Sequence, residues 1–120
     1  MQKKGSLLLI EDDQAIQESL TWVLEHEGYT VYSACHGKEG LEYLKRSLTP
    51  AVILLDIMMP VMDGFAFRNV WQQDPVYSQI PLVVMSADKQ LGTHLPQTKH
   101  EYFLNKPLDL DKLLEIVAQY

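Results

Sequence analysis

Short apolar runs alternate with helical patterns along this chain of 120 residues, and that alternation limits the folds open to it. Residues 6–10, 51–55 and 82–85 are almost entirely apolar. A strand that is apolar on both faces needs cover on both faces, as in a parallel sheet with helices on each side. Two shorter, mixed runs, residues 30–34 and 102–105, fit the edges of such a sheet. The pattern predicts an α/β domain with a doubly wound, five-stranded parallel sheet.

Four other segments have helical periodicity. We expect the first helix to end at Gly28, which can take the left-handed conformation, and the last to begin after Asp109 as N-cap. Trp22 and Trp71 are expected to be buried or half-buried. A further helix is expected between the strands at residues 82–85 and 102–105, as the fourth along the chain. Residues 91–96 contain glycine, threonine and proline, so this fourth helix should be shortened or irregular. The apolar residues that define the four helices are Ile16, Leu20, Val23 and Leu24; Leu41, Tyr43, Leu44 and Leu48; Phe67, Val70 and Trp71; and Leu110, Leu113, Leu114 and Val117.

Charge and cysteine content exclude several classes of protein. The formal net charge of −6 argues against direct binding to nucleic acid or to an anionic membrane. Cys35 is the single cysteine, so no internal disulfide forms and a reducing compartment is expected. No apolar run approaches the roughly 20 residues that span a bilayer. The apolar stretch near the start of the chain is also too short for a signal peptide. We therefore expect one cytoplasmic domain over residues 1–120.

Chemically active residues follow the predicted strands at their carboxyl ends, where open parallel sheets bind ligands. Two carboxylates about 4 Å apart repel by roughly 4 kcal/mol at an effective dielectric near 20. A hard cation offsets that repulsion, and Mg²⁺ suits the site because it needs only one or two carboxylates and keeps several waters. Mn²⁺ could substitute. The residues at these strand ends are Glu11, Asp12 and Asp13, then Asp56, then Ser86, then Lys106.

The same set can support phosphoryl transfer. A carboxylate such as Asp56 can form an acyl phosphate. The three phosphoryl oxygens then need positive charge and donors, which the metal, Lys106 and Ser86 can supply. We therefore predict that Asp56 accepts a phosphoryl group.

Plainer interpretations apply to several polar residues. Asp13 is better explained as a helix N-cap, and Asp63-Gly64 as a turn before a helix. Ser86 can be an ordinary strand-end hydroxyl and Lys106 a solvated lysine. The histidines do not cluster at metal-ligand spacing and are expected at the surface; they are His26, His36, His94 and His100.

Two other function classes remain open. The chain can be a docking module that works without phosphorylation. It can also be a magnesium-dependent phosphohydrolase, although such enzymes usually carry a second acid two residues after the nucleophile, where this chain has Met58. No segment is available as a cap domain over a substrate.

The run from Asp56 to Gly64, DIMMPVMDG, resembles the phosphoacceptor loop of the receiver domains of two-component response regulators. Residues 10–13, Ser86-Ala87 and Lys106-Pro107 resemble the other motifs of that family, in order, over essentially the whole chain. The resemblance implies a flavodoxin-like sheet of order 2-1-3-4-5, as in the chemotaxis regulator. The spacing from Asp56 to Lys106 is slightly shorter than is usual in the family, which agrees with the irregular fourth helix.

The resemblance also implies roles for individual residues. Asp56 would be phosphorylated and would bind the metal together with Asp12, with Glu11 acting through a bound water. The backbone carbonyl of Met58 would complete the protein ligands. The donor would be a phosphohistidine on a histidine kinase or a histidine phosphotransfer protein, and the downstream partner is not indicated.

The remaining roles concern the switch. Ser86 and Lys106 would hold phosphoryl oxygens, and the Lys106-Pro107 bond would be cis. Phe103 matches the aromatic switch position, where the ring turns inward as Ser86 moves toward the phosphoryl group. The face made by the fourth helix, the strand at residues 102–105 and the last helix would change its conformation. The chain would catalyse only its own phosphorylation and dephosphorylation, and act on no external substrate.

Overall fold

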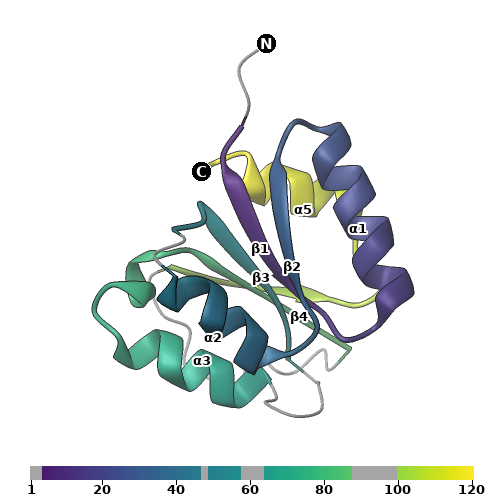
Figure 1. The fold of residues 1–120 in the computed structure, drawn as a ribbon. Helices are drawn as coiled ribbons and strands as arrows, with labels where there is room; N and C mark the ends of the chain where they lie inside the picture. The colour runs from purple at the N-terminus through teal and green to yellow at the C-terminus, as the bar shows by residue number, and fades with distance from the viewer. Residues whose placement is uncertain (1–3, 47–48, 58–63, 88–99) are drawn as a thin grey trace.

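The computed structural model describes residues 4–46, 49–57, 64–87 and 100–120, and these ranges contain five strands and four α-helices (Figure 1). The sheet is parallel and has the order β2-β1-β3-β4-β5, which confirms the predicted fold class. The shortened fourth helix was predicted within residues that lie outside the described ranges. The elements are β1 Ser6–Ile10, α1 Gln14–His26, β2 Thr30–Ala34, α2 Gly37–Lys45, β3 Val52–Asp56, α3 Gly64–Gln73, a 3₁₀ helix Tyr77–Gln79, β4 Leu82–Ser86, β5 Glu101–Asn105 and α5 Leu110–Val117.

The two faces of the sheet carry separate cores. Helices α2 and α3 cover one face and α1 and α5 cover the other (Figure 1). Successive side chains of β1 alternate between these cores: Leu8 and Ile10 pack toward α2 and α3, whereas Leu7 and Leu9 pack toward α1 and α5. All four are fully buried, which explains why the strand is apolar without interruption.

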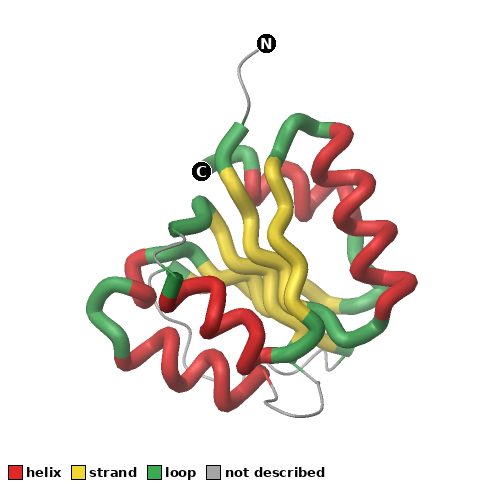
Figure 2. The backbone as a smooth tube through the Cα atoms, in the orientation of Figure 1, coloured by secondary structure: helices red, strands yellow, loops and turns green. Residues whose placement is uncertain are grey.

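The strand register brings the carboxyl ends of all five strands to one edge (Figure 2). Ile10, the last residue of β1, pairs with Ala34 at the end of β2 and with Leu55 near the end of β3. Ser86 at the end of β4 pairs with Asn105 at the end of β5. Residues that follow these strands therefore meet at a single edge of the sheet.

Polar caps and a glycine set the helix ends much as predicted. The Asp13 carboxylate accepts a hydrogen bond from Ile16 N at 3.1 Å and so caps α1. At the other end Gly28 takes a positive φ of 101°, and Tyr29 N donates to Leu24 O at 3.1 Å. The Asp109 carboxylate caps α5 in the same way as Asp13 caps α1.

The predicted burial of the two tryptophans is half right. Trp71 is buried, and its indole N–H donates to Ile80 O at 2.9 Å. The prediction for Trp22 is wrong, because its side chain is 68% exposed and stacks on His26. Two residues after buried Leu20, position 22 is turned about 200° around the helix, away from the core. None of the helices in the described part of the chain has the length and apolarity of a membrane span.

Candidate functional site

Three carboxylates meet where β1 and β3 end. Glu11 and Asp12 directly follow β1, and Asp56 is the last residue of β3. Each offers one oxygen in a group whose members all lie within 4.8 Å of one another. Glu11 and Asp56 are buried, whereas Asp12 is exposed. Acidic groups are thus concentrated at the carboxyl end of the sheet, and the group is open to solvent at Asp12.

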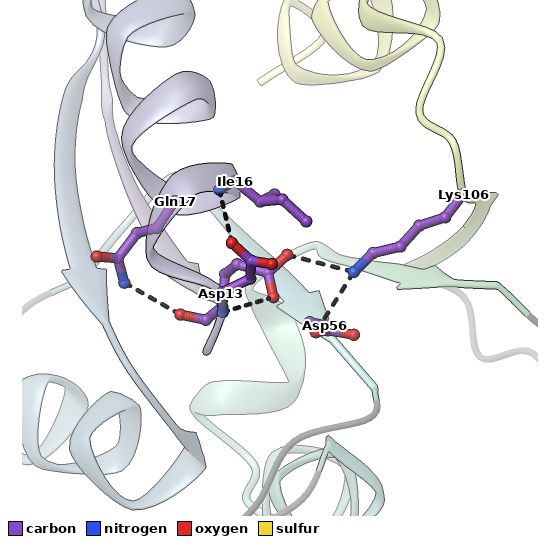
Figure 3. A network of polar contacts seen from close by, with 6 residues as sticks. Asp13, Ile16, Gln17, Asp56 and Lys106 are labelled. Carbon is purple, nitrogen blue, oxygen red and sulfur yellow. Dashed lines mark hydrogen bonds and ion pairs between the residues drawn. The ribbon is translucent and has the colours of Figure 1, made fainter.

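Lys106 joins this group from the end of β5 (Figure 3). Its Nζ lies 3.3 Å from Glu11 Oε1 and 3.4 Å from Asp56 Oδ2. The backbone N–H of Lys106 donates to Ser86 O at 2.7 Å, which ties the end of β5 to the end of β4. The Lys106-Pro107 bond is cis, as predicted. One ammonium group therefore bridges two buried carboxylates.

The protonation of Glu11 reflects this crowding. Burial is the main reason that the pKa of Glu11 rises from 4.5 to about 8, and the hydrogen bond and charge of Asp56 raise it further against the opposing effect of Lys106. Burial alone would lower the pKa of Lys106, but the charges of Asp56 and Glu11 raise it above 10.5. The Lys106 ammonium therefore stays charged, while Glu11, with its raised pKa, keeps a proton up to about pH 8 in the absence of a cation.

The donor set fits a hard divalent cation. Carboxylate oxygens are the ligands that Mg²⁺ prefers, and it tolerates an open coordination sphere. The group has two buried acids, Glu11 and Asp56, and one exposed acid, Asp12. The raised pKa of Glu11 shows that its negative charge is unfavourable there without a cation. Glu11, Asp12 and Asp56 are thus placed to share an ion, directly or through water. Met58, the fourth predicted ligand, lies outside the described residues.

Ser86 and Phe103 lie beside the acidic group on the two neighbouring strands. Ser86 ends β4, next to β3, and is 4% exposed. Phe103 in β5 is half-buried against the core on the α2 and α3 side. It pairs with Val84, two residues before Ser86 on the same strand. The two residues are therefore close neighbours across β4 and β5, and the coupled movement of the two side chains stays a prediction.

A close backbone contact brings α3 back to the end of β3. Gly64 N donates to Ile57 O at 2.9 Å. A Cβ at Gly64 would lie 2.3 Å from Ile57 Cα and 2.8 Å from Asp56 O, so only glycine fits there. The residues between these two points, 58–63, are outside the described ranges. The glycine predicted to start a helix thus also holds that helix against the strand that carries Asp56.

Sequence reasoning missed two sets of polar contacts. The Gln17 side chain donates to the backbone carbonyls of Glu11 and Ala34, at 3.1 Å each. Arg68 of α3 forms a buried, bidentate ion pair with Glu101 of β5. An arginine next to the apolar positions of α3 was the one available signal for the second, and nothing in the sequence pattern distinguished Gln17 from the other polar residues of α1.

Comparison with known proteins decides the family. The sequence model of the response regulator receiver domain matches residues 7–118. The chain belongs to the response regulator receiver domain family. Receiver domains are phosphoacceptor domains of two-component signalling.

Relatives of this receiver domain are found among full regulators and in solved structures. The chain is 36% identical over 115 residues to response regulator Rre1 of Synechocystis, covering 93% of this chain and 49% of Rre1. It therefore spans about half the length of that relative. A receiver domain of a signal transduction histidine kinase from Syntrophus aciditrophicus superposes with a TM-score of 0.85 at 26% identity, over 97% of this chain and 89% of that one.

A third comparison concerns a domain with a bound metal. The receiver domain of sensor histidine kinase PA1611 from Pseudomonas aeruginosa superposes with a TM-score of 0.84 at 23% identity, over 97% of this chain and 96% of that one. That structure is described with a magnesium ion coordinated in the active site cleft. At this identity the likeness shows the shared fold.

Proposed function

We propose that Asp56 of this receiver domain accepts a phosphoryl group from a phosphohistidine on a histidine kinase or a histidine phosphotransfer protein, and that residues 1–120 form one domain. One observation carries the assignment. The Asp56 carboxylate lies 3.4 Å from the Lys106 ammonium and within 4.8 Å of the oxygens of Glu11 and Asp12. A nucleophile with a cation and metal ligands around it is the arrangement that phosphoryl transfer needs.

The proposed metal is Mg²⁺, with Mn²⁺ as a substitute. Glu11, Asp12 and Asp56 would hold it together with the backbone carbonyl of Met58. When bound, the ion offsets the charge of the acids and of the phosphoryl oxygens. The three carboxylate oxygens within 4.8 Å of one another support this part of the proposal.

The chain's own groups perform the transfer. An Asp56 carboxylate oxygen attacks phosphorus, the P–N bond to the donor imidazole breaks, and the imidazole keeps the electron pair and takes up a proton. Lys106 turns from the carboxylates toward a phosphoryl oxygen, and the Ser86 hydroxyl donates to another. The phosphorylated domain then shifts toward the state in which both contacts are made, with Phe103 turned inward. The surface around β5 and α5 changes as a result, together with the predicted fourth helix, which lies outside the described residues.

The remaining parts of the proposal concern partners and location. A net charge of −6 supports protein partners over direct contact with nucleic acid or an anionic membrane. The exposed free thiol of Cys35 fits a reducing compartment, so the proposal includes a cytoplasmic location. The domain would catalyse only its own phosphorylation and dephosphorylation.

Intact mass spectrometry tests the acceptor. Acetyl phosphate with Mg²⁺ should add one phosphoryl group to the wild type and none to Asp56→Asn. Asp111→Asn, which removes an exposed carboxylate from the first turn of α5, should be labelled like the wild type. EDTA should abolish labelling of both competent proteins. Labelling of Asp56→Asn at the wild-type rate would refute the assignment.

A further inference from the structure

The turn that carries two of the acids is held by one side chain from α1. Gln17 lies in the first turns of α1, and its backbone N–H donates to Asp13 O at 2.9 Å. Its side-chain amide reaches back over the turn to the carbonyl of Glu11 at 3.1 Å (Figure 3). The same amide nitrogen also lies 3.1 Å from the carbonyl oxygen of Ala34. An amide NH₂ has two hydrogens, so it can donate one to each carbonyl. The flipped amide would place its oxygen against both carbonyls, so the donor orientation is the only one that fits.

The carbonyl that Gln17 holds belongs to the peptide group between Glu11 and Asp12. Holding the plane of that peptide restricts ψ of Glu11 and φ of Asp12, and so restricts the directions in which both Cα–Cβ bonds leave the backbone. Glu11 has further support, since it is buried and its N–H donates to Ala34 O at 3.0 Å. The exposed side chain of Asp12 has much less packing around it. The backbone therefore decides where the Cα–Cβ bond of Asp12 points and which positions its carboxylate can reach.

Strand pairing does not replace this contact. The pairing of β1 with β2 ends at Ile10 and Ala34, one residue before Glu11. The Gln17 amide holds the next peptide group, between Glu11 and Asp12, through the Glu11 carbonyl. Because the same amide donates to Ala34 O, it links that peptide to the end of β2. A side chain that holds a ligand's backbone in this way acts on a metal site from outside the ligand set, where substitutions typically change metal affinity 10- to 100-fold.

We propose that Gln17 is a positioning residue of the acidic site, which aims Glu11 and Asp12 by clamping the peptide between them to β2. The inference rests on the proposed function insofar as the acids bind a divalent cation. It adds a residue that touches neither the cation nor the phosphoryl group. Loss of the amide should lower Mg²⁺ affinity while leaving the fold in place.

Calorimetric titration of the unphosphorylated protein with Mg²⁺ at pH 8 tests the proposal. Gln17→Met keeps the length of the side chain and removes both donors, so Mg²⁺ affinity should fall roughly tenfold. Gln17→His keeps one N–H at a similar reach and is neutral at this pH, so its affinity should be intermediate. Gln14→Met is the matched control, because Gln14 is exposed on the same helix and donates to the exposed Glu18 side chain.

The outcomes distinguish failure of the Gln17 clamp from failure of the proposed metal site. Melting in EDTA identifies any loss of folding, and the proposal requires that affinity falls in variants that melt cooperatively near the wild-type temperature. Affinity within twofold of wild type in Gln17→Met, or an equal fall in Gln14→Met, would overturn the clamp. If Gln17→Met does not fold, wild-type affinity in Gln17→His would do the same. If the wild type itself does not bind Mg²⁺, the metal site of the proposed function fails, and the clamp with it.

Discussion

The raised pKa of Glu11 predicts an unusual dependence of stability on pH in the absence of metal. The folded protein holds a proton on Glu11 up to about pH 8, whereas the unfolded chain releases it near 4.5. Between these values the folded state binds the extra proton, so this stabilising contribution is complete at low pH and is lost as pH rises to 8. The usual carboxylate, with a lowered pKa, gives the opposite slope.

The magnitude follows from the two pKa values. Each pH unit inside this window changes the free energy of unfolding by about 1.4 kcal/mol for one proton. From pH 6 to pH 8 the Glu11 contribution should fall by about 2 kcal/mol, with the slope flattening near the folded-state pKa. Lys106 adds nothing to this slope, because its raised pKa affects stability only above 10.5. Saturating Mg²⁺ should reduce the slope, since the ion favours the ionised carboxylate.

Urea unfolding in EDTA at pH 6, 7 and 8 measures this effect. The wild type is compared with Glu11→Gln, which cannot ionise, and with Glu25→Gln, which removes an exposed acid from α1. The difference in stability between Glu11→Gln and wild type should grow by about 2 kcal/mol from pH 6 to pH 8, while Glu25→Gln should track the wild type. Histidine titration cancels in these differences. A constant difference across this range would refute the reasoning.

Two further predictions concern the frame around the site. Arg68→Met should cost about 3–5 kcal/mol in urea unfolding, because it leaves the carboxylate of Glu101 buried without the guanidinium, whereas the double variant Arg68→Met/Glu101→Leu should regain most of that loss; equal stability of the single and double variants would contradict this. Gly64→Ala should cost about 3 kcal/mol, since its Cβ would meet the Ile57 backbone at 2.3 Å. Gly40→Ala should cost less, because the contact it makes is with flexible side-chain atoms; the reverse order would show that the backbone at Gly64 can move.

The alternation of apolar runs with helical patterns was enough to predict the fold class, because the central strands β1, β3 and β4 are too apolar to be exposed and too short for a buried helix. Leu7 to Ile10 alternate between two cores, and a run of this kind has no stable place except a covered sheet. Trp22 shows the limit of the method. Trp22 lies within the predicted helix and is hydrophobic, yet it is exposed. Whether a helical residue reaches the core depends on its angular position around the helix axis.

The acidic site was predictable for a different reason, since parallel strands bring their carboxyl ends together whatever the loops contain. That rule placed Asp56 near Glu11 before any contact was known. The rule does not extend to Gln17 or to the Arg68–Glu101 pair, because these contacts depend on how far each helix is rotated against the sheet. Two helices with the same apolar pattern can differ in that rotation by enough to break a hydrogen bond.

The shared position of Lys106 limits how much its own contact with a phosphoryl group can contribute to the proposed switch. Its ammonium is already bonded to Glu11 and Asp56, so a phosphoryl group on Asp56 exchanges one ion pair for another. The exchange replaces one negative charge by nearly two, and one added charge at about 4 Å is worth at most about 4 kcal/mol at an effective dielectric of 20. The Lys106 side chain is 24% exposed, and solvent reduces that value to about 1–2 kcal/mol, or a 5- to 30-fold shift in population. From Lys106 alone, a shift of that size would make the phosphorylated conformation dominant only if the unphosphorylated domain already visits it at several per cent; a less populated state would need the Ser86 contact as well.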